Sequence, residues 1–454
     1  MEHKKSVRQT DQGSFSVPHN VAIGNMSTQN SQLLRERSPS AQIQRIREVK
    51  RMELLYERCC GIDVHKNMLM VCVFTGVRKK EIRQFGTMTD DIMEIVKWLK
   101  EENCQIAAME STGVYWKPVY NLFEQEGIET IIVNAQHIKA VPGRKTDVKD
   151  AEWIADLVRH GLVKASFIPS REQRELREMV RYRNEIISER ARELNRIQAV
   201  LEGANIKLGN VVSDISGATG MAILHALIDG KTNPEYLSTL AKGRLTEKMD
   251  QLQRALKGSV GKHQIQMLKL QLQHIDFLSS SIAEMDEDIK KKTESIEEYI
   301  ELIDEIPGIG RRSAERIIAE TGVVMTQFRN ADHFASWAGL VPGCNESAGK
   351  KKNCRTRKGN VFLKSTLVEC AHSAIRNKDS YFFAKYSKIA ARRGGKRAMV
   401  AIAHSMILAI YHILLNKEHF CDLGSDYFNT IYAEKIKQRN IKSLEKLGFS
   451  VSLS

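Results

Sequence analysis

CCGIDVHKNMLMVCVF, residues 59–74, contains two apolar runs of strand length, separated by a short polar turn at 65–67. Apolar runs of this length that are bounded by turn residues are typical of buried β-strands. The segment therefore predicts two strands joined by a tight connection, and the preceding residues, rich in Ser, Gln, Asn and Arg, predict a flexible arm.

Strand and helix patterns alternate after this pair of strands. A third strand is expected around 80–85, and a helix is expected at 89–101, where apolar residues recur on one helical face. The next expected elements are a strand at 105–110, a helix at 115–126, a strand at 128–133 and a helix that opens near Thr146, a suitable N-cap. The order β-β-β-α-β-α-β-α predicts a layered α/β domain.

The middle of the chain predicts two long helices. Residues 171–202 are highly charged, and apolar residues from Ile275 to Ile289 step by three and four within 263–297, as in a coiled-coil seam. Two interpretations are open: an antiparallel pair within one chain, or an oligomerisation arm of a homodimer or tetramer. Further helices are expected at 311–320, 331–339, 360–376, 380–392 and 397–415, and the last 35 residues have weak periodicity.

These changes of pattern predict five parts. They are an arm at 1–55, an α/β domain at 56–165, a coiled-coil and helical region at 166–300, a mainly α domain at 301–416 and a tail at 417–454.

The chain of 454 residues carries a formal net charge of +14, from 69 Lys and Arg against 55 Asp and Glu. Residues 307–397 hold 19 basic and 6 acidic residues, so this segment accounts for +13. An apolar content of 42% excludes wholesale disorder, and the concentrated basic excess favours nucleic acid as a partner.

Three features predict a cytoplasmic protein without a membrane partner. The eight cysteines lack CxxC pairs and zinc-like spacing, which is typical of reduced thiols, and no apolar run follows the basic N-terminus. The apolar stretch 398–415 contains histidines that would be costly in lipid, which favours a buried core helix.

Four acidic residues fall where α/β folds place their functional sites. Asp63 lies in the first strand, Glu110 ends the fourth, and Asp147 and Asp150 lie three apart at a helix start. Converging carboxylates repel one another unless a cation neutralises them, and oxygen-only ligands favour Mg²⁺ or Mn²⁺. Two such ions can clamp a phosphodiester during cleavage. The simpler interpretation is that Asp147 complements the helix dipole and Asp150 is solvated.

GIDVHK (61–66), ESTG (110–113) and KTDVKDA (145–151) resemble, in this order, the motifs of a known family. The family is that of bacterial insertion-sequence transposases with a RuvC-like DEDD domain of RNase H fold, related to the Piv invertase and known as bridge-RNA-guided recombinases. The run PGRKTDVKDAEWIADLVRHG (142–161) is characteristic of one subgroup. The resemblance implies that Asp63, Glu110, Asp147 and Asp150 hold Mg²⁺. It also implies double-stranded donor and target DNA as substrates and an element-encoded guide RNA as a partner.

The basic segment contains two candidate phosphate-binding features. IPGIG (306–310) has the form of a helix-hairpin-helix turn, in which Gly308 and Gly310 let backbone N–H groups approach a phosphate, and Arg311 and Arg312 follow it. A Gly-flanked loop at 341–359, which predicts a hairpin, concentrates six cations: Lys350, Lys351, Lys352, Arg355, Arg357 and Lys358. Such a cluster favours contact with phosphates, and the alternatives are a plain structural turn and a solvated charge run.

Ser347 lies beside these cations in ESAG (346–349). A serine there could attack a phosphodiester because cations stabilise the pentavalent charge, although most loop serines form turns or caps. The family resemblance implies that Ser347 is the nucleophile that becomes joined to DNA, and Ala348 stands where many members have glycine. We therefore expect a transposase in which Ser347 forms a phosphoserine-linked strand that a free 3′-hydroxyl rejoins. The alternatives are a metal-dependent nuclease without a covalent intermediate and a non-catalytic nucleic-acid-binding protein.

Overall fold

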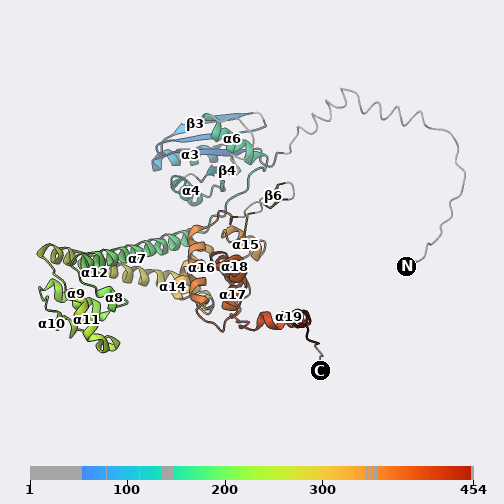
Figure 1. The fold of residues 1–454 in the computed structure, drawn as a ribbon. Coiled ribbons are helices and arrows are strands. Elements are labelled where there is room, and N and C mark those ends of the chain that lie inside the picture. The colour runs from blue at the N-terminus through green and yellow to red at the C-terminus, as the bar shows by residue number, and fades with distance from the viewer. Residues whose placement is uncertain are drawn as a thin grey trace, which may run out of the picture. The chain divides into compact units, whose positions relative to one another are not determined.

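The computed structural model describes residues 54–77, 79–111, 113–133, 147–343, 346–347, 350–351 and 355–450. Two compact units divide the chain between Ile168 and Pro169. The first unit is built around a sheet and the second almost entirely from helices (Figure 1). Each unit is described here by itself.

The first unit contains a mixed five-stranded sheet. Its strands are β1 (Cys59–Val64), β2 (Leu69–Phe74), β3 (Lys80–Phe85), β4 (Ile106–Glu110) and β5 (Thr130–Val133), in the order β3-β2-β1-β4-β5. Neighbours are antiparallel among β3, β2 and β1, and parallel among β1, β4 and β5. Parallel neighbours need crossover connections, which α3 (Thr89–Glu101) and α4 (Trp116–Gln125) provide. The layered α/β prediction is confirmed, and the sheet is compatible with an RNase H-like fold.

Alternate residues of β1 face two different helical layers. Cys60, Ile62 and Val64 belong to the apolar core shared with α3 and α4. Cys59 and Gly61 lie on the other face, against α6 (Asp147–Arg159). A Cβ atom on Gly61 would lie 2.3 Å from the carbonyl oxygen of Ala151 in α6. The absence of a side chain at residue 61 therefore lets the helix lie directly against the strand.

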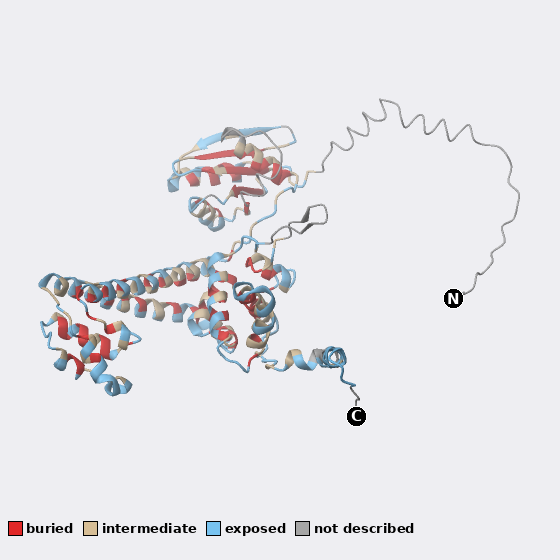
Figure 2. Ribbon diagram, in the orientation of Figure 1, coloured by how far each residue is buried: buried red, intermediate tan, exposed pale blue. Residues whose placement is uncertain are grey.

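The second unit begins with an antiparallel pair of long helices, α7 (Arg171–Gly203) and α12 (Lys262–Thr293). Leu176, near the start of α7, packs with Ile289, near the end of α12, whereas Leu201 packs with Leu268 at the opposite ends. Buried residues line the facing sides of the pair (Figure 2). The seam predicted from Ile275 to Ile289 thus packs against α7 of the same chain, as the antiparallel interpretation expects.

The remaining helices of the second unit lie between α7 and α12 or follow α12, where they include a C-terminal bundle. They are α8 (Leu208–Val211), α9 (Ala218–Ile228), α10 (Pro234–Ser238), η1 (Gly243–Lys248), α11 (Met249–Ala255), η2 (Glu294–Ile296), α13 (Glu297–Asp304), α14 (Arg311–Thr321), α15 (Ala331–Trp337), α16 (Val361–Ala374), α17 (Tyr381–Arg393), α18 (Gly395–Asn416) and α19 (Tyr427–Lys446).

The apolar helix α18 lies in the core of this bundle. It is long and apolar enough to cross a membrane, yet 61% of its most apolar window is buried inside the unit. Ile402, Ala403 and Ile407 are fully buried and belong to the same apolar cluster as residues of α14, α15 and α16. The prediction of a buried core helix is confirmed.

The tail contains more structure than its weak periodicity predicts. Helix α19 begins with Tyr427 and Phe428, whose ring centroids lie 5.2 Å and 5.4 Å from that of Tyr381. Two aromatic contacts hold the start of a helix whose other described residues are mostly exposed. Because the contacts of α19 described here involve only its first two residues, its sequence shows little apolar periodicity.

Candidate active site

Asp63 and Glu110 lie side by side at one edge of the sheet. The parallel pairing of β1 with β4 aligns Gly61 with Ala108 and Ile62 with Met109, and the next residues in this register are Asp63 and Glu110. Asp63 shares a strand face with Gly61, and Glu110 shares one with Ala108, because side chains alternate along a strand. Both acidic residues therefore lie on the α6 side of the sheet.

The start of α6 brings the next acidic residues to this edge. Asp147 is the first residue of the helix, and Asp150 immediately precedes Ala151, the residue whose backbone contacts Gly61. The side chain of Asp147 lies outside the described part of the chain, and its role stays a prediction. The close approach of α6 to β1 thus determines how near Asp150 lies to Asp63.

His65 is a partner of Asp63 that the sequence reasoning did not select. Its Nε2 atom lies 3.0 Å from the Asp63 carboxylate oxygen Oδ2. The Asp63 side chain is 14% exposed and the imidazole of His65 is 46% exposed, so the imidazole is the more solvent-accessible partner of the pair. The signal was present in the sequence, because His65 follows β1 directly and continued alternation places it on the same face as Asp63.

The electrostatics of Asp63 fit a cation-binding role. Burial raises the pKa of Asp63 above its ordinary value, His65 lowers it, and the carboxylates of Asp150 and Glu110 raise it further. Both neighbouring acids therefore lie within electrostatic reach of Asp63. A divalent cation would relieve this unfavourable burial of like charges.

No group of three His, Cys, Asp or Glu residues forms a ready metal site within the described ranges, which exclude the Asp147 side chain. The donor set nevertheless suits a hard cation, because Asp63, Glu110 and Asp150 offer only carboxylate oxygens. These residues, with Asp147 from the same helix start, are the ones that could hold Mg²⁺ or Mn²⁺.

Ser347 lies in a short hairpin of the second unit. Strand β6 (Glu346–Ser347) pairs antiparallel with β7 (Lys350–Lys351), with Ser347 opposite Lys350. The hairpin prediction is confirmed, while the side chains of these four residues and all of Lys352 lie outside the described part. Farther along the loop, Arg355 and Lys358 are exposed, and the exposed Arg357 reaches the Ser336 hydroxyl through Nη1 at 3.4 Å. The acidic residues belong to one unit and the serine to the other.

The glycine turn packs against protein. Gly308 has a φ of +87°, and a Cβ atom there would lie 2.4 Å from the Cys370 carbonyl oxygen and 2.5 Å from the Ala374 backbone nitrogen, both in α16. Gly308 thus permits close helix packing, which is the structural-turn alternative. At Gly310, the N-cap of α14, an added Cβ atom would have no atom within 4 Å.

The two arginines after the turn have acidic partners within the protein. Arg311 pairs with Glu297 and, at 3.1 Å from its Nε atom, with Glu315. Arg312 pairs with Asp286 of α12. Glu315 is an i+4 partner within α14, whereas Glu297 and Asp286 lie 14 and 26 residues away in sequence, where no local pattern predicts the pairing. Phosphate binding by this turn stays a prediction. In this structure the guanidinium groups of Arg311 and Arg312 form ion pairs with carboxylates.

The chain is similar to transposases and to a protein of an insertion element. Residues 60–206 match a DEDD-type family model described as "Transposase", and residues 300–387 match one described as "Transposase IS116/IS110/IS902 family". Together the matches span more than half of the chain. Two similar curated proteins are a "Probable family 20 transposase" of Pseudomonas aeruginosa and an "Insertion element IS116 uncharacterized 44.8 kDa protein" of Streptomyces clavuligerus. The first is 24% identical over 60% of this chain and 71% of its own length. The second is 26% identical over 54% and 68%.

Proposed function

Since the chain belongs to the IS110/IS116 family of transposases, we propose that it excises and inserts a mobile element by cutting and rejoining DNA with two sets of residues. The first set is the acidic cluster of Asp63, Glu110, Asp147 and Asp150, and the second is Ser347. The observation that carries the proposal is the β1–β4 register, because it sets two carboxylates side by side next to the helix that supplies the other two.

The acidic cluster binds Mg²⁺ or Mn²⁺ in this proposal. Ions held there would supply charge neutralisation for a phosphate of the DNA. The chain's own contribution is positional: the strand register holds Asp63 and Glu110, the glycine at 61 admits α6, and His65 holds one oxygen of Asp63.

The serine carries the covalent step. The Ser347 hydroxyl oxygen forms a bond to a DNA phosphorus, the bond from that phosphorus to one DNA oxygen breaks, and the leaving oxygen ends as a hydroxyl that has gained the serine proton. A free 3′-hydroxyl then attacks the phosphoserine, which restores a phosphodiester and returns the proton to Ser347. The basic residues of the loop favour the pentavalent charge.

The proposal includes two kinds of partner besides DNA. A guide RNA encoded by the element is supported by the family resemblance and by the +13 charge of 307–397. A homodimer or tetramer is supported by the exposed Leu270 and Phe277 on α12, outside the seam that α7 covers. Sequencing the RNA that co-purifies with the protein tests the first partner, and random cellular RNA without element-flank sequence would contradict it.

Substitution of the two sets of residues tests the chemistry. Ser347→Ala should abolish protein–DNA adducts on denaturing gels, while Ser365→Ala, at an exposed serine of α16, should leave them unchanged. Asp147→Asn should abolish recombination. Adducts that persist in Ser347→Ala would refute the nucleophile assignment. Cut DNA with free ends and no adduct in the wild-type protein would instead favour the metal-dependent nuclease.

A further inference from the structure

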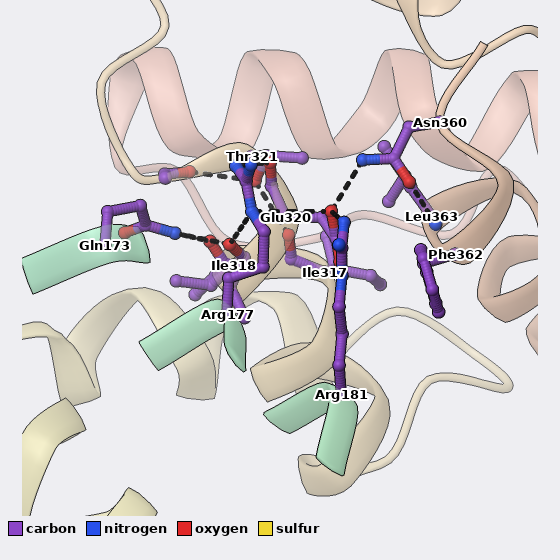
Figure 3. Close-up of polar contacts among 12 residues, drawn as sticks. Gln173, Arg177, Arg181, Ile317, Ile318, Glu320, Thr321, Asn360, Phe362 and Leu363 are labelled. Atoms are coloured by element: carbon purple, nitrogen blue, oxygen red, sulfur yellow. Dashed lines mark hydrogen bonds and ion pairs between the residues drawn. The ribbon is translucent and has the colours of Figure 1, made fainter. Parts of the chain in front are cut away.

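Three long side chains on one face of α7 contact the C-terminal end of α14: those of Gln173, Arg177 and Arg181. The Gln173 amide donates to the carbonyl oxygens of Ile318 at 2.6 Å and Ala319 at 2.7 Å. Arg177 donates to Ala319 at 3.1 Å and to the backbone carbonyl of Glu320 at 2.8 Å (Figure 3). The last carbonyls of a helix lack intrahelical partners, so these bonds attach the end of α14 to the long antiparallel pair.

Glu320 extends this attachment through its side chain. The residue is 4% exposed, and its carboxylate accepts two bonds from Arg181, at 2.6 Å and 2.8 Å. Oxygen Oε2 also accepts from the Asn360 amide at 2.6 Å, and the Arg181 guanidinium stacks 4.0 Å from the ring centroid of Phe362 (Figure 3). A carboxylate buried this deeply is stable only when such partners compensate its lost hydration.

Asn360 uses both ends of its side chain. Its Oδ1 atom accepts from the backbone N–H of Leu363 at 3.1 Å and caps α16, while its Nδ2 atom donates to Glu320. Its own backbone N–H donates to the Trp337 carbonyl oxygen at 3.4 Å. Asn360 is thus a junction between the end of α15, the end of α14 and the start of α16.

The Ser347 hairpin ends at this junction. Its base is a pair of extended segments, in which Gly343 donates to the Arg355 carbonyl at 2.9 Å and Arg357 donates to the Val341 carbonyl at 3.1 Å. Gly359 closes the base, because a Cβ atom there would lie 2.3 Å from the backbone nitrogen of Gly339. The residue that follows Gly359 is Asn360, so the base of the hairpin leads directly into the Glu320 contact.

We propose that the Arg181–Glu320–Asn360 junction is a positioning device that fixes the base of the Ser347 hairpin to the α7–α12 pair. The three residues act through the hairpin and touch no reacting atom. The expected effect of the junction on catalysis rests on the proposed function, since it requires that Ser347 attacks DNA. The attachment of the hairpin base to α7 is independent of the proposed function, because it follows from contacts among described residues.

The variant Asn360→Ser removes the hydrogen bond to Glu320 and keeps the N-cap of α16. Serine is an effective N-cap, so α16 keeps its first hydrogen bond, but its side chain is too short to reach Glu320. Asn330→Ser is the matched control, because Asn330 caps α15 by accepting from His333 N–H at 2.9 Å and is exposed. In the full-length protein, Asn360→Ser should speed amide hydrogen exchange of 355–360 by about tenfold, as expected for one lost buried hydrogen bond. Adduct formation at saturating DNA should slow by a similar factor, with DNA affinity unchanged.

A second variant exchanges the donor and the acceptor. Asn360→Asp alone places two carboxylates together and should impair the junction more than serine does, whereas adding Glu320→Gln restores a hydrogen bond with reversed polarity and should recover both readouts in part. Exchange and adduct rates in Asn360→Ser equal to those of Asn330→Ser would overturn the proposal. If the wild-type protein forms no Ser347-dependent adduct, the proposed function fails, and the exchange data alone decide whether the link exists.

Discussion

Replacement of Gly61 by alanine tests whether the close approach of α6 builds the acidic site. The added Cβ would lie 2.3 Å from the Ala151 carbonyl oxygen, 2.4 Å from the Ala155 nitrogen and 2.9 Å from its Cα, where ordinary contact begins at 3.4 Å. The helix must therefore move outward by about 1 Å, a disturbance of the kind that costs about 1–3 kcal/mol in well-packed interiors. Because Asp150 precedes Ala151, this movement also displaces one carboxylate from Asp63.

The direction of the change in stability distinguishes Gly61→Ala from replacement of a glycine that has open space around it. Where the backbone conformation suits alanine and the site has open space, alanine stabilises the fold by roughly 0.4–1 kcal/mol relative to glycine. Gly76→Ala is the matched control in the same unit, since a Cβ there has no atom within 4 Å. Hydrogen exchange of the β1 amides in the full-length protein should report faster opening for Gly61→Ala, and Mn²⁺ titration should report about tenfold weaker binding, as a 1.4 kcal/mol loss gives. Equal exchange and equal Mn²⁺ affinity in the two variants would refute the reasoning.

Two further predictions concern the helical unit. Arg183, 1% exposed, lies 2.7 Å from the buried Glu315 carboxylate, so Arg183→Met should lower the free energy of unfolding by about 3–5 kcal/mol in urea titrations. Arg312→Met, at an exposed ion pair, should cost under about 1 kcal/mol, and similar losses in both would contradict this. Burial lowers the pKa of His404 below 6.5, so the unfolded state binds a proton more readily than the folded state. The free energy of unfolding should thus fall as the pH drops below about 6.5. His404→Leu should flatten this slope between about pH 7.5 and 5.5, and an unchanged slope would assign it to other groups.

The sequence predicts β1, β2, β4 and β5 because they are largely apolar runs, and α3 and α4 because they have clear periodicity, whereas β3 is mostly polar and exposed. The strand faces follow as well, so the convergence of Asp63 and Glu110 was predictable from alternation and parallel order. The residues between α7 and α12 show no clear periodicity in the sequence, because they form five helices of 4 to 11 residues separated by frequent glycines.

Long-range polar pairing could not be predicted in the same way. Arg311 and Arg312 read as phosphate ligands because they follow a glycine turn, yet two of their three carboxylate partners, Glu297 and Asp286, come from α13 and α12. Glu320 likewise has no local signature, since its partners Arg181 and Asn360 are 139 and 40 residues away in sequence. Such pairs depend on the tertiary packing of helices, which periodicity within one helix does not encode.

The central position of α18 also has a consequence for how the protein is made. Residues of α14, α15 and α16 bury their apolar faces in the same core as this helix, but it leaves the ribosome after all of them. The sheet-based unit has its own core within the first 168 residues and can fold while synthesis continues. The nascent helical bundle, in contrast, must keep its apolar faces exposed until residue 416 emerges, so a chain that stops before α18 should be a substrate for chaperones and proteases.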